Sequence, residues 1–452
     1  VVSTQSTGKN MRELMTIQVG QCGNQIGAKF WELISDEHGV DPSGQFCGEP
    51  GYKSERLDVS FRSEVGGSHI PRAVLVDLEP STMDSIRSGQ FGQMFRAENF
   101  VVGNAGTGNN YAKGKLTVGL EQIDTIMNVV RKEVEACDYL QGFQLLHSFG
   151  GGTGSGLGSL ILQEIHIDYN ERFKQTFSIF PSEKLSDCVL EPYNSCLCLN
   201  SLLDYTDQII LMDNEALYDI CFRTLKLSCP TLGDLNNLVA LVMSGLTAGM
   251  RFPGQLNSDL RKICENLVPF VRTKILITGF APLTPKKVKP RLITVPELTS
   301  ELFSNFNMMA SLDVNSGRYL TCATIFRGQV SSSDVEESIL NIRQKNSQYF
   351  SPWIPRSISI AMCDVAPRGY KLASTFLGNT TAIKDVVDRV FRKFATMRSR
   401  RAYFHCYTNE GIEEDDFGQV ETGLLDLIAE YKNKEEMEVR NRRNREDSED
   451  ND

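Results

Sequence analysis

The chain has 452 residues, of which 41% are hydrophobic and 23% are charged. This balance is that of a globular protein, and the length allows a substantial core. The net charge of −10 disfavours a general nucleic-acid binder, because neutralising phosphates requires an excess of lysine and arginine. No apolar stretch approaches the roughly 20 residues of a membrane span. We therefore expect neither nucleic acid nor a membrane as a partner.

The cysteines and the two ends of the chain bear on its compartment. The twelve cysteines include no C-x-x-C pair and lack the spacing of zinc ligands, so we expect reduced thiols in the cytoplasm. Residues 1–10 are polar and have no apolar segment, which predicts a disordered extension rather than a secretion signal. Residues 435–452 mix arginines with acids and predict a disordered charged tail.

The first half of the chain alternates strand and helix patterns. Apolar runs predict strands at residues 14–19, 73–76, 100–102, 143–149, 177–180 and 209–212. The run 73–76 is apolar throughout, as in a parallel strand buried on both faces. Helical apolar periodicity follows several of these strands. Repeated strand–loop–helix units predict a doubly wound parallel sheet in an α/β domain.

Unusual loops follow four of the predicted strands, at residues 20–24, 77–79, 103–110 and 150–156. In doubly wound sheets, ligands lie beyond the carboxyl ends of the strands. Since all four loops follow strand ends, we expect them to converge on one edge of the sheet. That edge is the predicted ligand site.

The loop at residues 150–156 has five glycines in seven positions. A backbone with so few side chains can wrap around an anion, and the helix after it favours negative charge at its start. The loop contains neither G-x-G-x-x-G nor G-x-x-x-x-G-K-[ST]. A flexible linker is the alternative, but linkers rarely separate a buried strand from an amphipathic helix. We therefore predict a phosphate-binding loop.

The second half of the chain has a different pattern. Helices are predicted at residues 235–242 and 256–267, and strands at 273–280, 319–326, 357–363 and 373–377. This order predicts a second, smaller α/β domain with a mixed sheet. A strongly amphipathic helix starts at Ile383, and a last helix spans about residues 415–431. These two predict a helical region at the C-terminal end.

Several motifs, in chain order, resemble the tubulin family over about residues 11–431. They are the segments 20–25, 73–79, 150–156, 213–219, 251–254 and 294–298. The start Met11-Arg12-Glu13-Leu14 and the short loop 366–369 resemble the β type. The resemblance implies five regions: an extension at 1–10, a GTP-binding domain at 11–213, a core helix with an intermediate α/β domain at 214–381, C-terminal helices at 382–434 and a tail at 435–452.

The resemblance implies that GTP or GDP binds at the predicted strand edge. The residues implied to bind it are Gln21, Cys22, Gln25, Glu79, Gly106, Thr107, Gly108, Asn109, Ser148, Gly151, Gly152, Thr153, Gly154, Asp187, Glu191, Asn214, Leu232 and Asn236. The first loop would contact phosphates and base, loop 103–110 would close over the terminal phosphate, and the glycine run would hold the middle phosphates.

Some of these roles have plain alternatives. Glu79, helped by Asp77, would face Mg²⁺, which prefers one or two carboxylates plus phosphate oxygens; alone, it would be taken for a solvated turn residue. Asp187 and Glu191 would approach the ribose, but acids are also common at helix starts. The two asparagines, at positions 214 and 236, would bond the guanine edge, although a lone asparagine is usually a turn or cap residue.

Whether this chain can supply a catalytic base for GTP hydrolysis depends on the residue at position 262, which is Lys262. The resemblance implies that an α-type chain has a glutamate at this place, which activates water at the next subunit's nucleotide. An ammonium beside phosphates is a poor base near neutral pH. Lys262 is therefore expected to stabilise a neighbour's phosphates, and no catalytic residue is expected in this chain; the alternative is a solvated helix residue. The chain would be a GTPase only with a glutamate supplied in trans by α-tubulin.

Three departures from the family pattern are expected to matter. Leu232 stands where the family has an aromatic ring stacked on guanine, which predicts weaker nucleotide binding. The segment 284–291, Thr-Pro-Lys-Lys-Val-Lys-Pro-Arg, replaces the usual lateral contact loop and puts ordinary contacts with neighbouring protofilaments in doubt. The mixed-charge tail should recruit motors and microtubule-associated proteins poorly.

Three kinds of function are compatible with these features. The first is a β-tubulin-like subunit that pairs with α-tubulin in cytoplasmic microtubules of the cytoskeleton. The second is a tubulin-derived GTP-binding regulator that does not form ordinary microtubules. The third is an unrelated nucleotide-dependent enzyme such as a dehydrogenase, against which the missing G-x-G-x-x-G argues. The first is the prediction.

Overall fold

The computed structural model describes residues 12–48, 56–64, 66–182, 186, 188–254, 260–284, 293–351, 353–354 and 357–449, with side chains as far as residue 436. The extension at 1–10, Asp187 and nearly all of the segment 284–291 lie outside the described residues, so their predicted roles stay predictions.

In the described part of the chain, one sheet has ten strands in the order β11-β10-β12-β9-β8-β7-β6-β1-β4-β5. Its strands are β1 (Glu13–Val19), β4 (Ala73–Asp77), β5 (Phe100–Val102), β6 (Leu140–Ser148), β7 (Phe173–Phe180), β8 (Gln208–Asp213), β9 (Ile275–Ala281), β10 (Tyr319–Arg327), β11 (Ile358–Cys363) and β12 (Ala373–Thr380). A separate hairpin pairs β2 (Phe61–Ser63) with β3 (His69–Pro71).

The strands from β5 to β8 are all parallel, whereas those from β9 to β11 are mixed. β12 pairs antiparallel with both β9 and β10, and β10 pairs parallel with β11. The predicted fold class, a doubly wound parallel sheet, a mixed sheet and C-terminal helices, is confirmed. The structure adds that the mixed strands continue the parallel sheet, because β8 and β9 pair from Ile209–Ile275 to Leu211–Ile277.

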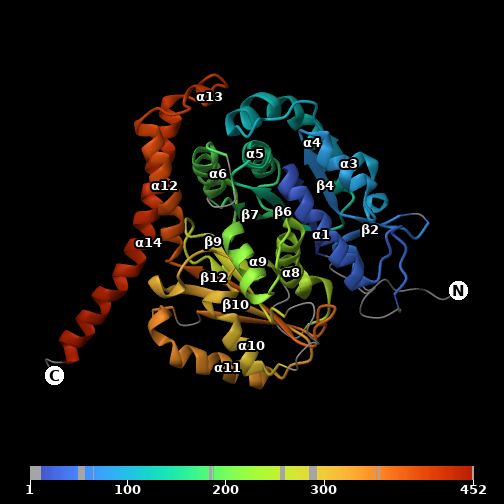
Figure 1. The fold of residues 1–452 in the computed structure, drawn as a ribbon. Helices are drawn as coiled ribbons and strands as arrows, with labels where there is room; N and C mark the ends of the chain where they lie inside the picture. Colours follow the sequence, from blue (N-terminus) through green and yellow to red (C-terminus); the bar gives the residue numbers. More distant parts are fainter. Residues whose placement is uncertain are drawn as a thin grey trace.

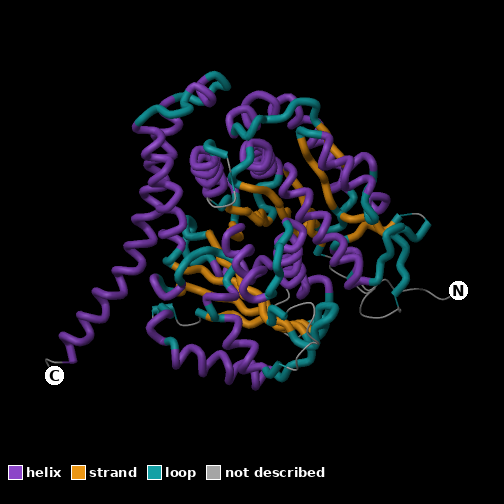
Figure 2. The backbone as a smooth tube through the Cα atoms, in the orientation of Figure 1, coloured by secondary structure: helices purple, strands orange, loops and turns teal. Residues whose placement is uncertain are grey.

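Helices cover both faces of the sheet (Figures 1 and 2). They are α1 (Gly20–His38), α3 (Pro80–Ser88), α4 (Val118–Glu135), α5 (Gly158–Asp168), α6 (Glu191–Tyr205), α7 (Asn214–Asp219), α8 (Leu232–Arg251), α9 (Leu260–Leu267), α10 (Val295–Leu302), α11 (Ser332–Lys345), α12 (Ile383–Ser399), α13 (His405–Thr408) and α14 (Glu414–Glu449). Along β8, Ile209 and Leu211 join the core beneath α4, α5 and α6, whereas Ile210 and Met212 join the core beneath α1, α3 and α8. This alternation puts an apolar layer on each face.

A buried charged cluster, which we call the Glu37 cluster, joins the two halves of the sheet. The carboxylate of Glu37, at the end of α1, accepts from Arg251 (2.8 Å) and Arg327 (3.0 Å). Ser244 of α8 donates to both carboxylate oxygens, at 2.8 and 2.9 Å. The three charged side chains are at most 3% exposed. Because α1 belongs to the parallel half and Arg327 ends β10 in the mixed half, the cluster ties the two together.

The C-terminal helices α12 and α14 run side by side along the outside of the molecule (Figure 1). α14 continues to Glu449, so residues 435–449 are helical where their charge predicted disorder. Glu and Arg, which are abundant there, are good helix formers, which explains the difference. Among the described helices, none is long and apolar enough to cross a membrane. All twelve cysteines are free.

Candidate functional site

The four loops after parallel strands meet at one edge of the sheet. A Cβ built on Gly20 would lie 3.2 Å from the backbone nitrogen of Gly154, so the first loop touches the glycine run. A Cβ on Gly106 would lie 2.3 Å from Oε1 of Glu79, which places the second loop against the third. The hydroxyl oxygens of Thr107 and Thr153 are 3.4 Å apart. The predicted convergence is present in the structure.

The glycines of the run 150–156 meet two different requirements, close packing at some positions and open backbone at another. A Cβ on Gly152 would lie 2.5 Å from Oγ1 of Thr107, and one on Gly156 would lie 2.3 Å from the carbonyl of Tyr111. These two glycines are required by close packing of loop against loop. Gly151 is different, because its Cβ would meet only Oγ of Ser148 at 3.4 Å. Its backbone is therefore open to a ligand, and the run then turns through residues 153–157 into α5.

Beside these loops lies a cavity of about 630 Å³, which we call the nucleotide-side cavity. The predicted residues in its wall are Gln21, Cys22, Gln25, Asn109, Ser148, Gly151, Glu191, Asn214, Leu232 and Asn236. The remaining wall residues are Gly150, Ile179, Pro181, Ser182, Ser186, Cys188 and Leu235. The first turns of α1, α6, α7 and α8 all contribute, and helix starts present free N–H groups and a favourable dipole to an anion.

Most of the predicted phosphate-side residues lie beside the cavity, whereas Asn109, Ser148 and Gly151 lie in its wall. Glu79, Gly106, Thr107, Gly152, Thr153 and Gly154 are joined by the loop contacts given above. Gly108 and Asn109 adopt left-handed backbone, each with φ of 57°, which turns the loop. Lys262 is elsewhere, on the exposed side of α9, and does not line the cavity. The cavity wall thus includes polar side chains from several helix starts as well as Ser148, Gly150 and Gly151 of the glycine-lined edge.

Asp77 and Glu79 fit a magnesium ion held mainly by phosphate oxygens. Asp77 ends β4, and its Oδ2 is buried without a hydrogen-bond partner. Burial raises the pKa of Asp77 to about 6, against the opposing effect of the Glu79 and Leu78 backbone N–H groups. Glu79 is exposed next to it. No group of three or more potential ligand side chains occurs among the described residues, so these carboxylates would need phosphate or water as co-ligands, as Mg²⁺ commonly has.

Two titratable groups in the cavity wall are tuned by burial. The thiol of Cys22 is desolvated, which raises its pKa to about 12 and keeps it neutral. Burial also raises the pKa of Glu191, while a hydrogen bond from Ser186 and the charge of Lys393 act the other way. A neutral thiol adds no negative charge to the wall that an anionic ligand would meet.

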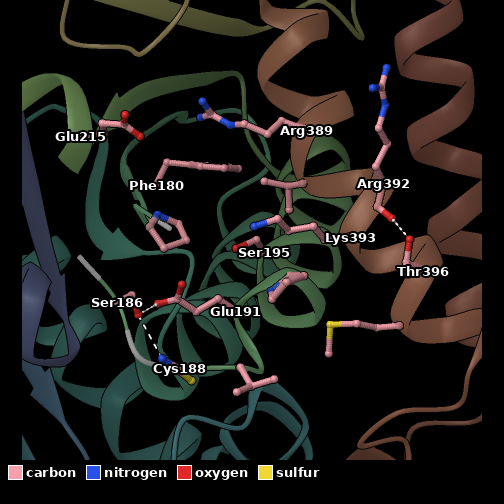
Figure 3. A pocket seen from close by; sticks show the side chains of 15 residues that line it. Phe180, Ser186, Cys188, Glu191, Ser195, Glu215, Arg389, Arg392, Lys393 and Thr396 are labelled. Carbon is pink, nitrogen blue, oxygen red and sulfur yellow. Dashed lines mark hydrogen bonds between the residues drawn. The ribbon is translucent and has the colours of Figure 1, made fainter. Parts of the chain in front are cut away.

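Glu191 also faces a second cavity, of about 480 Å³, between the start of α6 and α12 (Figure 3). Arg389 and Lys393 of α12 reach over this cavity, and Phe180 lines its inner side. Arg389 pairs with buried Asp213 at 3.0 Å. Asp213 also caps α7 by accepting from the backbone of Glu215 at 2.9 Å. That capping holds the first turn of α7, where Asn214 points into the nucleotide-side cavity wall.

The sequence did not reveal the role of Asn194, which connects two loops of the cavity by hydrogen bonds. It lies in the first turns of α6 and is 0% exposed. Its side-chain amide donates to the carbonyls of Asn109 (2.7 Å) and Gly150 (2.8 Å), one on each of two cavity loops. The only sequence signal is an amide inside a helix whose neighbours are mostly apolar. Such a signal does not say which loops the amide holds.

Comparison with protein-family models defines the class. Residues 13–222 match the model described as Tubulin/FtsZ family, GTPase domain. That match and the doubly wound sheet with its glycine-lined edge define a GTPase domain of the Tubulin/FtsZ class, for which guanine nucleotide is the ligand.

The second match narrows the family. Residues 272–392 match the tubulin C-terminal domain model, and they contain the mixed strands β9 to β12. Since the two domain models match in chain order and together span most of the chain, the protein belongs to the tubulin family.

Proposed function

We propose that the chain is a β-tubulin-like subunit that binds GTP with Mg²⁺, pairs with α-tubulin and polymerises head to tail into microtubules of the cytoplasm. The observation that supports this most is the nucleotide-side cavity, whose wall gathers Gln21, Asn214, Asn236 and the glycine run from four separate parts of the chain. A cavity of this size, with polar groups from several helix starts, suits a nucleotide.

The binding roles follow from position. Asn214 is the first residue of α7, and Asn236 lies just after the first turn of α8. Both line the cavity, where they would form hydrogen bonds with the guanine edge. Glu191 would approach the ribose from the start of α6, and Asp187 belongs to the same proposal. Residues 106–109 and 151–154 would surround the phosphates, while Glu79, helped by Asp77, would hold Mg²⁺ together with phosphate oxygens.

Hydrolysis in this proposal requires two subunits. Lys262 lies on the exposed side of α9, away from the chain's own cavity. An ammonium is a poor base for activating water but stabilises phosphate charge well. The chain's own GTP would therefore be hydrolysed at its contact with the next α subunit, by a glutamate of that subunit.

Co-expression with an α-tubulin tests the proposal. We expect a heterodimer and a polymer whose growth requires GTP. Lys262→Ala should lower retention of the α subunit's nucleotide, whereas Arg261→Ala, a neighbouring exposed cation on α9, should change it little. Monomeric protein under conditions that pair a reference β-tubulin would contradict the proposal.

A second candidate is a tubulin-derived GTP-binding regulator that does not form ordinary microtubules. It is favoured by the basic segment 284–291 and by arginines in the acidic tail. These features would weaken contacts with neighbouring protofilaments and with microtubule-associated proteins and motors. GTP binding without heterodimer formation, in the co-expression experiment, would favour this second candidate.

A further inference from the structure

Asn194 uses every hydrogen-bonding position of its side chain. Besides donating to the carbonyls of Asn109 and Gly150, its Oδ1 accepts from the backbone N–H of Tyr111 (3.1 Å) and from the hydroxyl of Tyr407 (2.7 Å). An asparagine side chain has two N–H donors and an oxygen with two lone pairs. The four bonds join two cavity loops to the C-terminal region, and we call this set the Asn194 clamp.

The C-terminal side of the clamp is the segment 402–410. Beyond Tyr407, the amide of Asn110 donates to the carbonyl of Cys406 (2.7 Å), and Tyr193 donates to the carbonyl of Ala402 (3.0 Å). Thus the segment 402–410 is bonded to both the loop 103–110 and the start of α6. The segment includes α13 and connects α12 to α14 past the ends of these two helices (Figure 1).

The backbone around this segment is unfavourable by itself. Arg401 and Tyr403 have φ of 51° and 57°, in the left-handed region that side-chain-bearing residues rarely adopt. Such backbone persists only where surrounding contacts hold it. The bonds to Tyr193, Asn194 and Asn110 hold the segment in place together with the packing of Phe404 and Tyr407 against Phe417. Loosening these bonds would therefore loosen both the segment and the loop.

We propose that Asn194 is a positioning residue for the bound nucleotide, and that through Tyr407 it couples GTP retention to the seating of the segment 402–410. This rests on the proposed function, in which loop 103–110 closes over the terminal phosphate. A partner that displaces the segment would then release the loop through the clamp. Because GDP lacks the terminal phosphate, the clamp acts on GTP more strongly than on GDP.

Three substitutions in the full-length chain, each replacing an uncharged side chain by another, test the coupling. The dissociation constants for GTP and GDP are measured by equilibrium dialysis in Mg²⁺ buffer. Asn194→Leu removes the donor to the carbonyls of Asn109 and Gly150, the second of which is buried. It should weaken GTP binding by about tenfold and GDP binding by less than about threefold. Tyr407→Phe removes the hydroxyl that donates to Asn194 (2.7 Å) and, more weakly, to the carbonyl of Leu190 (3.4 Å). It should weaken GTP binding by about threefold, with GDP binding unchanged.

Tyr111→Phe is the matched control. It removes one buried bond of a tyrosine hydroxyl, to Ser201 of α6 (2.9 Å), and leaves in place the backbone N–H of Tyr111 that belongs to the clamp. It should leave both dissociation constants within about twofold of wild type while lowering the melting temperature about as much as Tyr407→Phe.

The outcomes distinguish failure of the proposed coupling from failure of the proposed function. Equal weakening of GTP and GDP in the Tyr407→Phe variant, or the same loss in Tyr111→Phe, would overturn the coupling and leave the proposed function standing. A wild-type chain that binds neither nucleotide would overturn both. If Asn194→Leu does not fold, the Tyr407→Phe result alone decides.

Discussion

The Asn194 clamp and the Glu37 cluster are both buried and polar, but they connect different parts of the molecule. The clamp is neutral and fastens loops beside a cavity, whereas the Glu37 cluster is charged and joins the two halves of the sheet. A neutral amide beside an anion site adds no charge that the ligand would meet. An ion cluster suits the junction, since breaking a buried ion pair is costly. We therefore expect that breaking the Asn194 clamp weakens nucleotide binding, whereas breaking the Glu37 cluster lowers the stability of the fold.

The largest effect is expected from Glu37→Leu. It removes the carboxylate between Arg251 and Arg327 and leaves two buried cations without their counter-ion. We expect the free energy of unfolding to fall by about 3–5 kcal/mol, measured by urea denaturation. Glu32→Leu is the control, because Glu32 is exposed and, within the described part of the chain, pairs with Lys29 on the same helix. Its loss should cost less than about 0.5 kcal/mol.

Acid should weaken the same cluster. Although burial opposes ionisation, the charges of Arg327 and Arg251 lower the pKa of Glu37 from 4.5 to about 2. A carboxyl with a lowered folded pKa stabilises the protein above its unfolded pKa, and this stabilisation is lost as pH falls from about 4.5 to about 2. Glu37→Gln should remove this part of the pH dependence of unfolding. An unchanged pH profile in that variant would contradict the assignment.

Asp77 should behave in the opposite way. Burial raises its pKa from 3.8 to about 6, so ionisation destabilises the nucleotide-free protein as pH rises from 3.8 past about 6. Asp77→Asn should stabilise that form by about 1–3 kcal/mol at neutral pH, in a thermal or urea unfolding experiment. It should also reduce the dependence of GTP binding on Mg²⁺. Asp84→Asn, an exposed acid on α3, is the control and should do neither.

The smallest effect is expected from Leu232→Tyr. Leu232 is 65% exposed in the wall of the nucleotide-side cavity. A ring there can stack on the base, which is worth about 1 kcal/mol beyond area burial and corresponds to roughly fivefold tighter GTP binding. The dissociation constant from equilibrium dialysis checks this. Equal affinity in the two proteins would mean that this side chain does not cover the base.

The sequence predicted the positions of the sheet's strands well, because parallel strands buried on both faces form apolar runs such as 73–76, but it predicted no order of the strands within the sheet. It also predicted that four loops converge, since loops after parallel strands share an edge. It did not predict that β9 pairs with β8, because that pairing depends on register across 60 residues of chain. Nor did it predict Asn194, whose partners lie 44 to 213 residues away. Contacts of that kind are fixed by packing, which no local pattern records.

The most direct test of the account is to identify the nucleotide bound to the purified chain. Protein prepared in Mg²⁺ buffer is denatured, and the released nucleotide is separated by ion-exchange chromatography and compared with the protein concentration. The account predicts about one guanine nucleotide per chain, with little adenine nucleotide, and its loss from an Asn214→Leu/Asn236→Leu double variant that remains folded. An adenine nucleotide at that stoichiometry, or retention of guanine nucleotide by the double variant, would contradict it.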